Sequence, residues 1–257
     1  MTMMKPPFDR RSDAKEKDDS GSYRLNKFIA HAGLCSRREA AEWVKAGKIK
    51  VNGKVEKNPA IMVTPTDRIE YQGNQVRIEE KKVYLLMNKP KDTITTVSDD
   101  RARRTVMDLV QGKYDVRLYP VGRLDRNTTG LLLLTNDGEL TKKLTHPSHE
   151  IKKIYHVFLD REFAAKDLAK LKKGIKLDDG FIKPDKVDPV KNGQPNEVGV
   201  EIHSGRNRIV RRMFEALDYR VLKLDRVYFA GLTKKDLPRG RFRELTEREL
   251  IMLRHFT

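Results

Sequence analysis

A short stretch in the middle of the chain places one carboxylate between two arginines, directly before an apolar run. Asp125 lies between Arg123 and Arg126, in the sequence from Gly122 to Gly138. Guanidinium neighbours keep a carboxylate ionised at neutral pH, and an ionised carboxylate can act as a nucleophile or as a general base. The same charges also fit an ordinary surface ion pair, which contributes little to stability. The stretch therefore makes Asp125 a candidate for chemistry without deciding the matter.

The elements around Asp125 are those expected of a functional loop. The four leucines at 131–134 predict a buried strand, and Asn136-Asp137-Gly138 predicts the turn that ends it. Asp125 would then lie on a loop supported by a rigid strand, where functional side chains are often found.

Other kinds of site are poorly supported. His146, His149 and His156 are close in sequence, but Pro147 interrupts any helix that would align the first two, and no Cys or Glu completes a set of metal ligands. The chain has no phosphate-binding glycine loop and no sequence typical of a serine nucleophile. We therefore expect neither a metal nor a nucleotide cofactor, and Asp125 remains the candidate.

The composition favours a polyanionic partner. In 257 residues, 54 Lys and Arg stand against 37 Asp and Glu, which gives a formal net charge of +17 and indicates nucleic acid. We find no signal peptide and no long apolar stretch, which argues against a membrane partner. The single cysteine, Cys35, excludes an intramolecular disulfide and fits a cytoplasmic protein, in which it would be a small packed residue. The lack of heptads argues against a coiled-coil dimer, and we expect a monomer.

The N-terminal part of the chain divides into an arm and a small module. Residues 1–22 are predicted to be a disordered basic arm, and residues 23–80 a compact module. A first helix starts near Leu25 and ends at Gly33, and Ser36 and Glu39 form a capping box for a second helix that runs to about residue 46. Strands follow at 49–51, after a turn at 52–53, and at 67–71.

Four basic residues gather around the second helix of this module. They are Arg37, Arg38, Lys45 and Lys48. They could form a phosphate-binding surface or simply a solvated helix face, and the pattern alone favours neither.

Residues 81–257 are predicted to form a second domain. Strands are expected at 83–87, 154–159 and 198–202, and helices at 164–173, 208–217 and after Thr246. The helix at 208–217 should carry apolar residues on one side and Arg208, Arg211 and Arg212 on the other. Strands and helices without regular alternation indicate an α+β domain with a mixed, largely antiparallel sheet.

Four stretches resemble, in the same order, the motifs of the bacterial ribosomal-RNA pseudouridine synthases. They are Asn88-Lys89-Pro90, Gly122-Arg123-Leu124-Asp125 with the leucine run after it, Lys153-Ile154-Tyr155, and the basic stretch from Gly205 to Met213. The module from Arg24 to about Tyr71 is similar to the small RNA-binding fold called alpha-L, and together the resemblance covers nearly everything after residue 22. Ile209 departs from the pattern, because many relatives have Gln or Glu there. His146-Pro147-Ser148 and Leu237-Pro238-Arg239-Gly240 look most like the large-subunit branch of the group.

The resemblance implies an enzyme that detaches a uracil from its ribose within RNA, rotates it and rejoins it through carbon five, without cofactor or metal. It implies that Asp125 acts on the sugar as nucleophile or base and that Arg211 pairs with it. Tyr155 would stack on the flipped uracil and take part in removing the proton from carbon five. Arg123 and Arg126 would hold the RNA backbone or the flipped nucleotide, and Arg208 and Arg212 would also bind RNA.

The expected substrate is therefore ribosomal RNA, with the large subunit or its assembly intermediate favoured. Two alternatives are a non-catalytic RNA-binding factor in ribosome assembly and a synthase that acts on tRNA. The first explains the positive charge but not an Asp, a poor phosphate partner, inside a basic loop.

Overall fold

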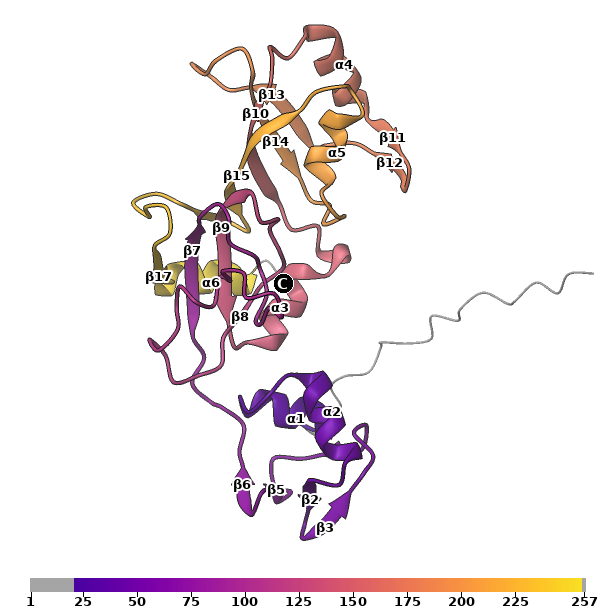
Figure 1. The fold of residues 1–257 in the computed structure, drawn as a ribbon, viewed down its shortest axis with the longest axis vertical. Helices are drawn as coiled ribbons and strands as arrows, with labels where there is room; N and C mark the ends of the chain where they lie inside the picture. The colour runs from indigo at the N-terminus through magenta and orange to yellow at the C-terminus, as the bar shows by residue number, and fades with distance from the viewer. Residues whose placement is uncertain (1–20, 256–257) are drawn as a thin grey trace, which may run out of the picture. The chain divides into compact units, whose positions relative to one another are not determined.

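The computed structural model describes residues 21–255 and divides the chain into two compact units, residues 1–81 and 82–257 (Figure 1). The predicted basic arm falls almost entirely on residues 1–20, which lie outside the described residues. None of the helices between residues 21 and 255 combines the length and the apolar character needed to span a bilayer.

The first unit packs two short helices against short strands. The elements are β1 (Tyr23–Arg24), α1 (Leu25–His31), α2 (Arg37–Lys45), β2 (Ile49–Val51), β3 (Lys54–Glu56), β4 (Met62–Val63), β5 (Ile69–Tyr71) and β6 (Asn74–Val76). Strands β3, β2, β5 and β6 form an antiparallel sheet in that order. Its core includes Leu25, Ile29, Val44 and Ile49, each fully buried, and Cys35 is packed there as expected.

The predicted start of α2 is confirmed. The Ser36 hydroxyl accepts a hydrogen bond from the backbone N–H of Glu39 at 3.2 Å, and the Glu39 carboxylate accepts one from the N–H of Ser36 at 3.4 Å. This reciprocal capping satisfies two N–H groups that a helix start would otherwise leave unpaired.

The second unit is built on a mixed, mostly antiparallel sheet, as predicted. Its elements are β7 (Tyr84–Lys89), β8 (Tyr119–Pro120), β9 (Thr128–Thr135), α3 (Gly138–Thr145), η1 (Pro147–His149), β10 (Lys153–Leu159), α4 (Ala165–Lys173), β11 (Ile175–Leu177), β12 (Gly180–Ile182), β13 (Lys186–Pro189), β14 (Glu197–Ile202), α5 (Ile209–Glu215), β15 (Val221–Phe229), β16 (Leu232–Thr233), β17 (Phe242–Glu244) and α6 (Glu247–His255). The strand order is β13-β14-β10-β15-β9-β7-β17, and only the β15–β9 pair is parallel among the pairs described in this sheet.

Strand β9 is buried on both faces, which explains its unbroken run of leucines. Leu131 and Leu133 pack in the core that includes α3 and α6, whereas Leu132 and Leu134 pack in the core formed with the segment at 106–118. A strand covered on both sides reads as a continuous apolar run rather than an alternating one.

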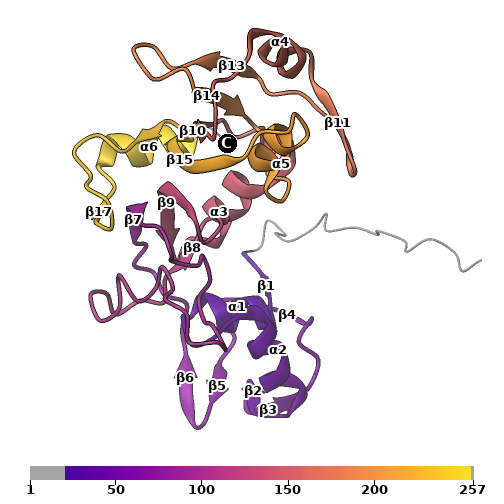
Figure 2. The same cartoon turned by 45° about the horizontal axis from the view of Figure 1, so that its top comes forward.

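Helices α4 and α5 cover the other part of the sheet. Figure 2 shows α5 beside β15, and Leu171 of α4 and Phe214 of α5 share a core with Val157 of β10 and Val198 of β14. Strand β15 lies between β10 and β9 in the sheet.

Two local predictions need correction. The leucine strand ends at Thr135 as predicted, but the residues after it lead directly into α3, because the Asp137 side chain accepts hydrogen bonds from the N–H groups of Glu139 and Leu140 and caps a helix. The helix at 208–217 is predicted to carry its three arginines on one polar side, and the structure does not place Arg211 there. Arg211 is only 8% exposed and donates to the Val221 carbonyl at 2.9 Å, so it points toward the sheet.

Candidate active site

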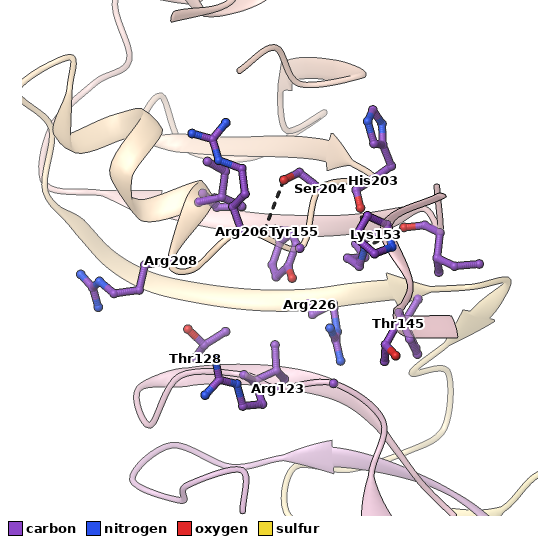
Figure 3. A pocket seen from close by; sticks show the side chains of 18 of the residues that line it. Arg123, Thr128, Thr145, Lys153, Tyr155, His203, Ser204, Arg206, Arg208 and Arg226 are labelled. Carbon is purple, nitrogen blue, oxygen red and sulfur yellow. Dashed lines mark hydrogen bonds between the residues drawn. The ribbon is translucent and has the colours of Figure 1, made fainter. Parts of the chain in front are cut away.

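A pocket of about 640 Å³ opens in the second unit where the loop before β9 meets β10, β15 and the segment before α5 (Figure 3). Its lining includes Asp125 from the loop, Tyr155 from β10, Arg226 from β15 and Arg208 from the N-terminal end of α5. Residues that are far apart in the sequence thus line one cavity.

Asp125 faces two arginines, of which Arg208 also lines this pocket. Its Oδ2 atom lies 3.7 Å from Nε of Arg211 and 4.0 Å from Nη1 of Arg208. These are ion-pair distances but not hydrogen bonds, and Arg211 Nε has no hydrogen-bond partner among the described residues. The carboxylate is therefore held by charge while its lone pairs remain available to another donor.

Arg211 is fixed from the other side. Its Nη1 donates to the Val221 carbonyl, and burial lowers the pKa of this guanidinium, which the charge of Asp125 partly opposes. Arginine nevertheless stays protonated in proteins. Asp125 thus faces a permanent positive charge whose position is set by β15.

The loop that carries Asp125 is held at both ends by hydrogen bonds. The Thr95 hydroxyl donates to the Leu124 carbonyl at 2.8 Å and accepts from the Leu124 N–H at 3.2 Å. The Thr128 N–H closes the loop on the Asp125 carbonyl at 3.0 Å. The main chain on each side of Asp125 is therefore fixed.

Lys89 provides the third support for this loop. Its side chain is fully buried and its ammonium donates to the carbonyls of Pro90, Arg126 and Thr128 at 3.0, 3.2 and 2.8 Å. Burial lowers the pKa of Lys89 to about 8, although the charges of Asp125 and Asp92 oppose this shift. The lysine thus holds the loop from beneath and contributes positive charge near Asp125.

Strand pairing places Tyr155 on the same face of the sheet as Arg226. Tyr155 is paired with Arg226 on β15 and with Val200 on β14, and residues directly opposite in a sheet share a face. Figure 3 shows the Tyr155 ring in the pocket beside β15. An aromatic ring thus forms part of the wall of a cavity that also contains a carboxylate.

The pocket carries more positive than negative side chains. Its basic lining residues are Arg123, Lys153, Arg206, Arg208 and Arg226, and its acidic ones are Asp125 and Glu150. Burial and the nearby Arg226 charge lower the pKa of Lys153 to about 8, and its ammonium donates to the carbonyls of Ile151 and His203 at 2.9 and 2.6 Å. This excess of cations suits a polyanionic substrate.

Other residues expected from the sequence lie elsewhere. Arg126 pairs with Asp92 at 3.4 Å and not with Asp125. Arg212 reaches the turn between β11 and β12, where it binds Asp178 and Asp179.

The basic residues predicted near the second helix belong to the first unit. Arg37, Arg38, Lys45 and Lys48 are all exposed there, and Lys45 pairs with Glu42 at 2.9 Å.

Sequence reasoning missed several residues of the pocket. Lys153 and Arg206 of the pocket, and Lys89 beneath the Asp125 loop, lie inside the motifs that carried the resemblance, so the motifs themselves contained the signal. Arg226 had no such signal, because it lies in the strand at 221–229, for which no motif was recognised. Thr95 also escaped notice, since its role depends on a contact with Leu124 made by folding.

Comparisons with known proteins agree with this geometry. The family model described as RNA pseudouridylate synthase matches residues 83–216. This chain belongs to the RNA pseudouridylate synthase family. A second model, the S4 domain, matches residues 24–69, so the first unit contains an RNA-binding S4 domain.

Similar proteins cover nearly the whole chain. The chain is 46% identical to a Bacillus subtilis protein named ribosomal large subunit pseudouridine synthase B, over 90% of this chain and 95% of the relative. It is 36% identical to an uncharacterized RNA pseudouridine synthase of Aquifex aeolicus, over 90% and 93%. A crystal structure of a pseudouridylate synthase has a TM-score of 0.66 at 30% identity and covers 90% of this chain and 99% of that one.

These matches support catalysis by the second unit. The non-catalytic RNA-binding factor is not favoured, because such a factor would not account for a family model that matches residues 83–216, which include Asp125, Tyr155 and Arg208 of the pocket.

Proposed function

We propose that this protein converts uridine to pseudouridine in ribosomal RNA of the large subunit, and that Asp125 carries the reaction. The observation that supports the proposal most is the position of the Asp125 carboxylate, which faces Arg211 and Arg208 in a cationic pocket beside Tyr155. The name of the Bacillus subtilis relative supports the choice of the large subunit. A cytoplasmic location and a monomeric state complete the proposal.

Asp125 acts on the ribose of a uridine that has left its helix. The carboxylate is charge-paired but forms no hydrogen bond with either arginine, so it can approach the sugar as nucleophile or as base. Arg211 holds it in place by charge, with its Nε 3.7 Å from the carboxylate. The loop that carries Asp125 is held by hydrogen bonds from Thr95 and Lys89, and it keeps the carboxylate in position while the uracil is detached and rejoined.

Tyr155 stacks on the flipped uracil. A base that leaves a helix loses a few kcal/mol of stacking, and an aromatic ring in the pocket replaces part of it. Arg123, Arg126, Arg208 and Arg212 contact the RNA near the flipped nucleotide. Arg212 must exchange an Asp178 or Asp179 carboxylate for a phosphate to do so.

The S4 domain holds the RNA at a second place through Arg37, Arg38, Lys45 and Lys48. Exposed lysines and arginines fix a nucleic acid by its phosphates and carry little sequence information. The choice of uridine would therefore rest mainly on the second unit.

Mapping pseudouridines in a deletion strain tests the substrate. Carbodiimide tagging and primer extension should show one or more large-subunit rRNA stops that vanish on deletion and return with the wild-type gene. Loss of a tRNA stop instead would transfer the activity to tRNA. An unchanged pattern in every RNA would contradict the proposed activity.

A further inference from the structure

Arg226 is a buried cation on the floor of the pocket with hydrogen-bonding capacity to spare. The residue is 3% exposed. Its Nε donates to the Leu131 carbonyl at 2.8 Å, and its guanidinium carbon lies 4.5 Å from the centre of the Phe229 ring. Within residues 21–255, its buried Nη2 finds no acceptor. One edge of the guanidinium is thus fixed by Leu131, whereas the buried Nη2 has no hydrogen-bond partner among the described residues.

Thr128 is a second unsatisfied polar group in the same cavity. Its hydroxyl is buried and has no hydrogen-bond partner in the described part of the chain. Thr128 is paired with Leu224 on β15, two residues before Arg226, so both side chains belong to adjoining strands on one face. Figure 3 shows the Arg226 side chain projecting from β15 toward the neighbouring strand that carries Thr128.

Buried polar groups without partners are rare and demand an explanation. An unpaired buried group costs about 1 to 3 kcal/mol, and more when it is charged. This cost is removed if a ligand supplies the missing acceptor. Because Arg226 and Thr128 both line the pocket, the acceptor would arrive with the substrate.

We propose that Arg226, with Thr128 beside it, reads the uracil base by donating a hydrogen bond to one of its carbonyl oxygens. The inference rests on the proposed function. Tyr155 lies directly opposite Arg226 across the β10–β15 pair, so a base stacked on the Tyr155 ring places its edge beside the guanidinium. Arg226 is then a catalytic residue that contacts the leaving base, whereas Asp125 works on the sugar.

The chemistry of the base makes this contact stronger during the reaction. When the bond between C1′ and N1 breaks, its electron pair stays on the uracil, and the negative charge spreads over N1, O2 and O4. The pair returns as C5 bonds to C1′; C5 then gives up its proton and N1 takes one. A guanidinium fixed beside O2 or O4 binds the anionic base better than the neutral one, which lowers the barrier.

The test replaces one carbonyl oxygen at a time with sulfur, a weaker hydrogen-bond acceptor. Large-subunit rRNA is transcribed with uridine, 2-thiouridine or 4-thiouridine, and full-length enzyme is assayed at single turnover by nucleoside chromatography. The wild-type enzyme should be slowed about tenfold or more by one of the two thio substitutions. In Arg226→Gln that same ratio should approach one, because the glutamine amide is shorter and uncharged and no longer supplies the charged donor. Comparing enzymes on the same RNA cancels any effect of sulfur on RNA folding.

Further measurements separate contact with the base from structural roles. On uridine RNA, Arg226→Gln should react on the order of a hundredfold more slowly with an RNA dissociation constant within about threefold of wild type. Thr128→Val, which removes only the hydroxyl, should be slowed several-fold. If Arg226→Gln does not fold, Arg226→Lys keeps the buried charge, but its ammonium does not reach as far as the arginine Nη2, so its sulfur ratio should also fall toward one.

Three results would overturn the inference. They are equal sulfur ratios in wild type and variant, a rate within threefold of wild type in Arg226→Gln, and an affinity loss as large as the rate loss. In each of them the wild-type enzyme still forms pseudouridine, so the proposed function stands. If the wild-type enzyme formed no pseudouridine in uridine RNA, that result would instead contradict the proposed function.

Discussion

The carboxylate of Asp125 and the guanidinium of Arg211 lie 3.7 Å apart, and no hydrogen bond joins them. Arg211 donates a hydrogen bond from Nη1 to the Val221 carbonyl, and its Nε faces Asp125. The Asp125 side chain is about one-third exposed, with 32% of its surface open. The pair thus combines a fixed charge with a carboxylate that a substrate can still reach.

Replacing Arg211 should lower the reaction rate strongly and the stability of the folded protein only slightly. Arg211→Met leaves Asp125 without this charge, and we expect a loss of about a hundredfold in single-turnover rate, the size found when one charge-stabilising donor is removed. Stability should fall only by about 1 kcal/mol, since the main loss is the hydrogen bond to Val221. Tritium release and urea unfolding measure the two quantities. The exposed Arg220→Gln serves as control, and equal rates in the two variants would contradict the role of Arg211.

The titration of Lys89 should appear in the pH dependence of the reaction. Its ammonium has three donors for three carbonyls, and the neutral amine keeps two. Because burial lowers the pKa of Lys89 to about 8, we expect the single-turnover rate to fall above pH 8. In Lys89→Arg the alkaline fall should disappear or move to higher pH, since arginine stays protonated.

Unfolding does not explain such a fall. The pKa of Lys89 is lower in the folded protein than its ordinary value of 10.5, so between pH 8 and 10.5 the unfolded chain binds more protons. The contribution of Lys89 to stability therefore rises with pH over this range. Lys153 also titrates near pH 8, and Lys153→Arg is the matched control. An alkaline limb that moves only in Lys153→Arg would assign it to Lys153.

Gly130 is required by the close approach of β15. A Cβ atom there would lie 2.2 Å from the Arg226 carbonyl oxygen, and φ is +105°, a region that side chains avoid. Gly130→Ala should lower the free energy of unfolding by about 3 kcal/mol or more. Gly205→Ala, where nothing lies within 4 Å, should change it little. Similar denaturation midpoints would contradict the packing of β9 against β15.

The S4 domain should show its contacts in the salt dependence of RNA binding. Arg37→Glu with Arg38→Glu should weaken binding and flatten the log-log slope by about 0.7 to 0.9 for each lost phosphate contact. Filter binding at several salt concentrations gives the slope. If it stays unchanged, these arginines do not touch RNA.

Local patterns predicted the elements better than they predicted the contacts. The run at 131–134 and the capping box at Ser36 were readable because their signals lie within a few residues. Asp137 was read as a turn because a turn and a helix cap use the same residue type. The side of the helix on which Arg211 lies was misjudged, because its burial depends on Val221 from a later strand.

The candidate site was readable only where motifs mark it. Asp125, Tyr155 and Arg211 lie in recognisable stretches, whereas Arg226 acquires its place from the pairing of β15 with β10 and β9. Even if residues 221–229 are recognised as a strand, their sequence does not show which side chain reaches the pocket. That depends on how this strand is aligned with β10 and β9, which are distant in the sequence.

Release of tritium from carbon five of uracil in labelled large-subunit rRNA, comparing wild type with Asp125→Asn, tests the central claim most directly. Asparagine keeps the shape of Asp125 and removes its charge, so folding and RNA binding should persist while release stops. Release by Asp125→Asn at the wild-type rate would contradict the account.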